Sequence, residues 1–102
     1  VVVTAGACGF TSIIRAEKAP ERSVDIVVES GCAMVQKMAA EITSLRRRDA
    51  LAGILNNPVY LAAGRHLKHA ACPVPAAVLK ALEVEAGLNV KKDATIVFEK
   101  DG

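Results

Sequence analysis

The chain has 102 residues, of which 52% are hydrophobic and 24% charged, and its formal net charge is +2. This length supports one modest hydrophobic core, so we expect a single domain over residues 1–102. No apolar run approaches the ~20 residues that span a bilayer. One tyrosine, two phenylalanines and no tryptophan leave no platform for stacking nucleic-acid bases. The composition therefore argues against an integral membrane protein and against a nucleic-acid-binding protein.

The N-terminal part of the chain is typical of an antiparallel β unit. Residues 1–4 and 11–18 are rich in β-branched side chains, and the glycine-containing stretch AGACGF interrupts them. A turn is predicted at residues 19–22. Residues 23–30 then alternate apolar and polar side chains, which indicates a strand with one buried face.

From Ser30 onward the apolar residues recur at helical spacing, which predicts three to four helical segments. We expect these helices over residues 31–45, 49–55 and 58–69, and from Cys72 to a stop at Gly87. A final strand is predicted over residues 94–100. The fold class is therefore α+β: an antiparallel sheet of three to four strands, made of the N-terminal β-hairpin and the C-terminal strand, with the helices packed on one face.

The cysteines are the main functional clue. Their odd number and wide separation fit a reduced cytoplasmic protein better than a disulfide-stapled secreted one. Cys32 and Cys72 fall at predicted helix N-termini, where the partial positive charge favours a thiolate. Cys8 lies in the glycine-flanked turn. If these three corners meet at one rim of the fold, Cys72 is expected to be the most reactive thiolate, Cys32 the second, and Cys8 a third ligand or resolving thiol.

Such a site would suit a metal ion or sulfur chemistry. His69 stands three residues before Cys72, so Cys8, Cys32, Cys72 and His69 are candidate ligands for zinc or an iron–sulfur cluster. The alternative is that the cysteines are small buried hydrophobes that fill space where helices leave the sheet. The protein would then be a non-catalytic structural or interaction module, including a homodimer. Whether the protein is an enzyme stays open.

Cys72-Pro73-Val74-Pro75 resembles the C-P-x-P motif that opens a helix in sulfur-carrier proteins of the TusA type. This local resemblance covers Ala71 to Lys100 and implies that Cys72 carries a persulfide for transfer to a partner. Over nearly the full length, including AGACGF, ESGC and KHAACPVPAAVLKALEVEAGL, the chain resembles a small uncharacterised prokaryotic family of unknown function. That resemblance implies a cytoplasmic single-domain protein and no particular activity.

Basic side chains crowd the middle third of the chain, at Arg46, Arg47, Arg48, Arg65, His66, Lys68 and His69. This distribution is typical either of a solvated charged face or of an anion-binding face. The second interpretation predicts an anionic ligand at Arg46, Arg47, Arg48 and Arg65. A protein partner or a second copy is the other candidate, and exposure of Leu55, Val59 or Leu61 would indicate a dimer face.

Overall fold

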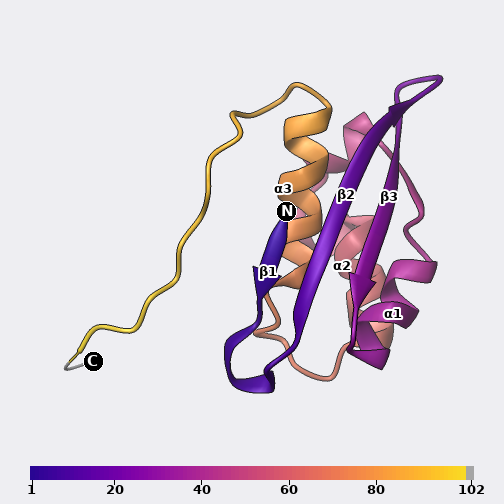
Figure 1. Ribbon diagram of the computed structural model, residues 1–102. Helices are drawn as coiled ribbons and strands as arrows, with labels where there is room; N and C mark the ends of the chain where they lie inside the picture. The colour runs from indigo at the N-terminus through magenta and orange to yellow at the C-terminus, as the bar shows by residue number, and fades with distance from the viewer. Residues whose placement is uncertain (101–102) are drawn as a thin grey trace.

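The computed structural model describes residues 1–100 (Figure 1). A four-stranded antiparallel sheet, in the strand order β1-β2-β3-β4, carries three α-helices on one face. The predicted α+β class is confirmed. None of the helices in the described part of the chain is long and apolar enough to cross a membrane.

The sheet is built around one long hairpin. Its strands are β1 (Val2–Thr4), β2 (Thr11–Ala19), β3 (Ser23–Ser30) and β4 (Ser44–Arg46). Ile14 of β2 and both Val24 and Ile26 of β3 are buried under the helices, while the residues between them face solvent or are only half-buried. Ala19 pairs with Ser23 across the turn, so the predicted turn and both long strands are confirmed.

The helices follow the expected apolar faces but are shorter than predicted. They are α1 (Ala33–Ala40), α2 (Pro58–His66) and α3 (Val74–Glu85), with short 3-10 turns η1 (Gly6–Cys8), η2 (Arg47–Leu51) and η3 (Ile54–Asn56). The helix expected at 31–45 ends at Ala40 because the following residues join the sheet. Thr43 accepts a hydrogen bond from the Ile26 N–H (2.9 Å), and Leu45 pairs with Val24. The helix expected at 49–55 is replaced by η2 and η3.

The last helix ends as its sequence predicts. Gly87 has a φ of 75°, a left-handed conformation that glycine adopts without steric cost. The N–H of Gly87 donates to the carbonyl of Val84 (3.1 Å), and the N–H of Leu88 donates to that of Glu83 (2.8 Å). These two bonds are the Schellman arrangement, which satisfies carbonyls left unpaired at a helix C-terminus.

The predicted C-terminal strand at 94–100 is wrong. Residues 89–100 form an extended segment without strand pairing, and every side chain in it is exposed. Figure 1 shows this segment in yellow, running from the end of α3 away from the sheet. A strand requires a hydrogen-bonded neighbour, and the fourth strand of the sheet is β4 instead.

Candidate functional site

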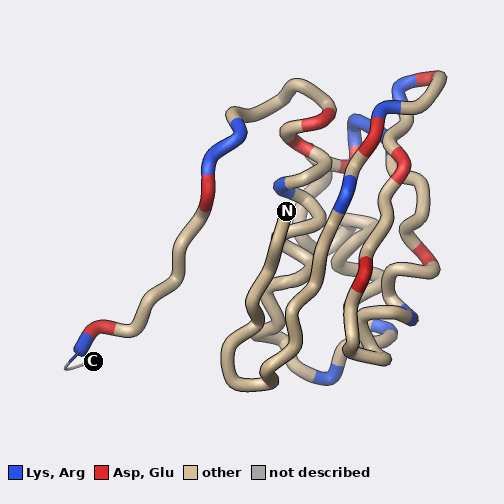
Figure 2. The backbone as a smooth tube through the Cα atoms, viewed as in Figure 1, with Lys and Arg blue, Asp and Glu red and all other residues tan. Residues whose placement is uncertain are grey.

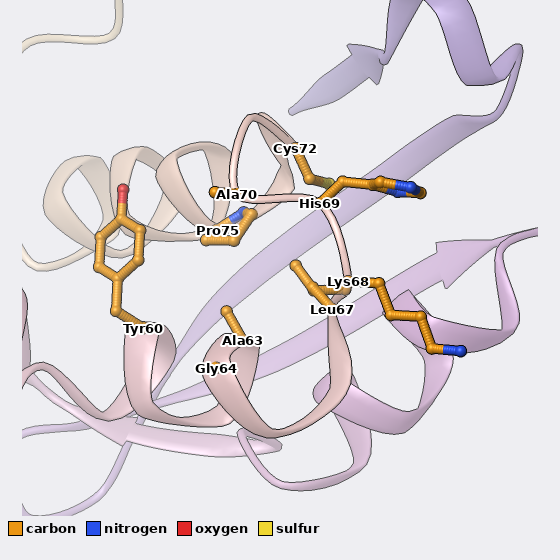
Figure 3. Close-up of a pocket in the computed structure, with 9 residues that line it drawn as sticks. All are labelled: Tyr60, Ala63, Gly64, Leu67, Lys68, His69, Ala70, Cys72 and Pro75. Carbon is orange, nitrogen blue, oxygen red and sulfur yellow. The ribbon is translucent and has the colours of Figure 1, made fainter.

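Cys72 lines a pocket of about 320 Å³ between α2 and the beginning of α3 (Figure 3). Tyr60 and Pro75 line it on one side, and Leu67 and His69 come from the connection between the two helices. In Figure 3 the imidazole of His69 extends away from Tyr60 and Pro75. We call this cavity the Cys72 pocket.

The connection between α2 and α3 fixes the position of Cys72. Its N–H donates to the carbonyl of His69 (3.2 Å), which closes a tight turn. Pro73 caps α3 and Pro75 lies in its first turn, where a proline removes no needed hydrogen bond. The Cys72 side chain is half-buried and packs against the hydrophobic core. The sequence thus places this thiol at a pocket wall and next to the start of a helix.

The segments that carry Cys8 and Cys32 lie at one end of the sheet. Thr4 pairs with Thr11 and Ser12 pairs with Ser30, so the β1–β2 turn and the β3–α1 connection emerge side by side. The ring of Phe10 covers Gly31, since a Cβ added there would lie 3.1 Å from it. The α2–α3 connection also lies at this lower end of Figure 1.

This shared end does not assemble a metal centre. No group of three or more His, Cys, Asp or Glu residues in positions to hold a metal occurs among residues 1–100. Cys8 is exposed on η1, whereas Cys32 is half-buried against the core and uses its backbone N–H to bond the Ser30 hydroxyl (3.1 Å). Because the thiols face different surroundings, the predicted zinc or iron–sulfur site at Cys8, Cys32, Cys72 and His69 finds no support.

A second pocket, of about 250 Å³, is lined almost entirely by arginine. Its walls are Arg22 from the β2–β3 turn, Arg46, Arg47 and Arg48 from the β4–η2 segment, and Leu51. We call it the arginine pocket. Figure 2 shows the tip of the β2–β3 hairpin, which carries both an acidic and a basic residue, near the basic β4–η2 segment at the upper end of the molecule.

Backbone contacts hold these arginines together. The carbonyl of Arg22 accepts a hydrogen bond from the N–H of Arg47 (3.0 Å), and Arg46 pairs with Ser23. The Asp49 carboxylate accepts from the Arg46 N–H (2.7 Å), which fixes the start of η2. The Arg47 Nε donates to the carbonyl of Ala86 at the end of α3 (3.3 Å).

The guanidinium groups of the arginine pocket have no carboxylate partner in the described part of the chain. The ion pairs there join Arg15 with Glu29, and Arg65 and His66 with Glu41. A guanidinium carries five N–H donors, so Arg47 keeps donors beyond the one that it gives to Ala86. The pocket therefore gathers four guanidinium groups that form no side-chain ion pair within residues 1–100, although the Asp49 carboxylate lies at the Arg46 backbone.

Arg65 does not belong to the arginine pocket. It lies near the end of α2, where its side chain bonds the Glu41 carboxylate (2.5 and 2.8 Å), and His66 bonds the same carboxylate. The Arg65 bond first, and the His66 bond second, lower the pKa of Glu41 below its ordinary value of 4.5. The fourth arginine of the cluster, predicted to be Arg65, is Arg22 instead. Only the pairing of β3 with β4 brings Arg22 to the other arginines, and residues 44 and 45 of β4 were predicted as helix.

Of the three apolar residues considered for a dimer face, two are exposed and one is buried. Leu55 is 88% exposed and Leu61 47% exposed, whereas Val59 is fully buried. Leu51 and Ile54 are also exposed, so η2 and η3 present apolar side chains to solvent.

Comparison with known proteins gives a family. A family model described as a family of unknown function matches residues 1–98. The chain belongs to the family DUF6951. No curated protein and no solved structure matches this DUF6951 chain. The resemblance of its C-P-x-P stretch to sulfur carriers of the TusA type therefore gains no support.

Proposed function

We propose that this DUF6951 protein is an anion-binding protein whose arginine pocket recognises a phosphoryl group or a similar small oxyanion. The observation that carries the proposal is the gathering of Arg22, Arg46, Arg47 and Arg48 around one pocket without a carboxylate partner among residues 1–100. Like charges held together raise the local electrostatic potential, and a bound anion relieves their repulsion.

The chemistry of the lining favours an oxyanion. Planar guanidinium groups donate parallel N–H bonds that match phosphate and carboxylate oxygens. The pocket has about 250 Å³ and no aromatic lining residue. Sites for drug-sized ligands have roughly 300–1,000 Å³, so this pocket suits a small charged group and not a large planar one. Absence of a stacking side chain and the modest net charge disfavour nucleic acid as the ligand.

Titration with inorganic phosphate and with pyrophosphate tests the proposal. Binding is followed by NMR chemical shifts at low ionic strength, because exposed charges farther apart than about 10 Å are screened at 0.1 M salt. Arg22→Gln and Arg48→Gln should each weaken binding about tenfold, since a charge-assisted hydrogen bond contributes roughly 1.5–3 kcal/mol before screening.

Arg15→Gln is the matched control. It removes the same charge from an exposed ion pair on β2, outside the arginine pocket, and should change the affinity less than about twofold. Equal weakening in Arg15→Gln would show that only the net charge matters. Unchanged binding in both pocket variants would exclude the arginine pocket as the site.

The Cys72 pocket supports a second candidate function, thiol chemistry at Cys72 in a reduced, cytoplasmic setting. Its support is that Cys72 lines a defined pocket beside His69 and Tyr60 and precedes α3, while no disulfide engages the cysteines of the described chain. Cys32 and Cys8 do not line this pocket and are the less favoured reactive thiols. Zinc and iron–sulfur binding form no part of this proposal, because no ligand group is assembled.

Alkylation mapped by mass spectrometry distinguishes a reactive thiol from a packing residue. Cys8 is exposed and serves as the internal standard, while Cys72 is only partly exposed. A reactive Cys72 should be alkylated faster than Cys8 despite its lower exposure. If Cys72 reacts more slowly than Cys8 throughout the neutral pH range, its role is packing.

A further inference from the structure

The C-terminal segment has the composition of a strand without the structure of one. Thr95, Ile96, Val97 and Phe98 favour extended backbone, yet residues 94–100 pair with nothing. Ile96 is 90% exposed, Val97 75% and Phe98 92%. The family match extends to residue 98, so this apolar run belongs to the part of the chain that the family shares. Three adjacent large apolar side chains in water form an exposed hydrophobic patch, which is typical of an interaction site.

The sheet offers a matching unsatisfied edge at β1. Ile14 exchanges hydrogen bonds with Val1 (2.7 and 2.8 Å), and the Ala5 N–H donates to Phe10 (3.1 Å). In an antiparallel pair the bonded residues alternate, so the N–H and C=O groups of Val2 and Thr4 point away from β2 to the open side.

The β1 edge also lacks the protection usual for edge strands. Lysine, proline or inward-pointing charge normally discourages pairing with another chain. Residues 1–4 are Val-Val-Val-Thr, with Val1 52% and Val2 68% exposed. The opposite edge differs, because β4 ends at Arg46 and continues into further arginines.

We infer that residues 94–99 of one copy add as a strand to the β1 edge of a second copy, and that the exchange is reciprocal. Side chains alternate along a strand, so Ile96 and Phe98 share one face and Thr95, Val97 and Glu99 the other. The first pair fits the helix-covered face, where Val3 is buried. Val97 then lies with Val2 on the outer face.

A second copy of the chain is the partner that fits the open β1 edge, because it allows a closed dimer. Within residues 1–100 each chain has one unpaired strand-like segment and one open β1 edge, and a two-fold symmetric exchange satisfies both in a closed dimer. Within one chain the segment stays exposed along its length and runs away from the sheet (Figure 1). The added pairing is β-augmentation, in which main-chain hydrogen bonds supply affinity and alternate side chains supply specificity.

Sedimentation equilibrium of the full chain tests the inference. The wild-type chain should be dimeric, and Ile96→Asp or Phe98→Asp should each raise the dimer dissociation constant by more than about tenfold. Val90→Asp is the control, since Val90 is 72% exposed in the same segment but lies outside residues 94–99. It should leave the dimer intact. At concentrations where every chain is monomeric, circular dichroism should be the same for the wild type and all three variants, because within one chain these side chains are exposed.

Disulfide mapping distinguishes exchange from closure within one chain. A Val2→Cys chain mixed with a Val97→Cys chain should form a link between residues 2 and 97, which only two copies can make. Directly opposed residues on neighbouring strands have Cβ atoms about 4.5–5.5 Å apart, close to disulfide reach. The inference fails if the wild-type chain is monomeric, if its dimer is indifferent to Ile96→Asp and Phe98→Asp, or if a Val2→Cys/Val97→Cys chain links only to itself.

Discussion

Arg22 occupies a backbone conformation that its side chain disfavours. Glu21 and Arg22 have φ values of 61° and 59°, and they form the centre of the β2–β3 turn. A non-glycine residue in this left-handed region costs roughly 1–2 kcal/mol. Asn-Gly is the usual pair at such positions. An arginine here is explained if its guanidinium is needed in the arginine pocket.

Two substitutions at Arg22 separate turn strain from anion binding. Both Arg22→Gln and Arg22→Asn remove the guanidinium and should weaken phosphate binding about tenfold. Asparagine tolerates the left-handed conformation, so Arg22→Asn should be more stable than Arg22→Gln by about 0.5–1 kcal/mol in urea unfolding. Equal stability of the two variants would show that the turn stores no such strain.

Asn57 is a buried amide with every polar atom in use. It is 1% exposed, its Oδ1 accepts from the Val59 N–H (3.0 Å), and its Nδ2 donates to the carbonyls of Asp49 (2.8 Å) and Ala52 (3.3 Å). It thus caps α2 and ties η2 to it. Pattern alone predicts a break at Asn56-Asn57 but does not show which asparagine is the cap, since that depends on packing.

Asn57→Ala should lower the free energy of unfolding by about 2 kcal/mol, because it removes a cap and leaves buried backbone groups unpaired. Chemical denaturation measures the change. Asn56→Ala is the matched control: Asn56 is exposed, and the effect should stay within about 0.5 kcal/mol. Similar losses in the two variants would contradict the assignment of Asn57 as the cap.

At the scale of elements, one carboxylate connects α1 with α2. Glu41 follows the last residue of α1, and its bonds to Arg65 and His66 tie it to the end of α2. Because these bonds favour the ionised form, the pKa of Glu41 is lower in the folded chain than its ordinary value. Its stabilising contribution is therefore present above pH 4.5 and is lost as the pH falls through the lowered pKa.

Glu41→Gln should remove that part of the acid dependence. Relative to the wild type, the variant should be less stable near neutral pH and should lose less stability on acidification below about pH 4.5. Thermal unfolding across the acid range measures both. Glu29→Gln, which breaks an exposed pair on the outer face of the sheet, is the control. Parallel pH profiles for Glu41→Gln and the wild type would contradict the linkage.

The elements that were predicted correctly are those whose side-chain pattern agrees with their surroundings. Strand β3 alternates in sequence and in burial, and Val74, Val78, Ala81 and Leu82, which recur at helical spacing in α3, are buried. The predictions for residues 44–45 and for residues 94–100 were wrong for opposite reasons. Residues 44–46 pair with β3, although residues 44 and 45 follow a helical pattern. Residues 94–100 have the composition of a strand but pair with no neighbouring strand. In both cases, whether the segment forms a strand depends on pairing with residues far away in the sequence.

Which site residues come together in the folded molecule depends on the same long-range strand pairing. The turns that bear Cys8 and Cys32 do meet at one end of the sheet, as the hairpin order allows. The sequence does not reveal that one thiol faces solvent and the other the core. The arginine pocket needs β4 beside β3, which brings Arg46 next to the turn residue Arg22.

The exchange of residues 94–99 predicts two separable effects of truncation after Asn89. The removed side chains are exposed throughout, so each chain should keep its free energy of unfolding within about 0.5 kcal/mol when measured at concentrations where the wild type is monomeric. The wild-type dimer should instead gain stability with protein concentration, because association stabilises only the folded state. Truncation should abolish that concentration dependence of the unfolding midpoint. If the dilute monomer is strongly destabilised by truncation, the segment packs on its own chain, and the open β1 edge is filled from within.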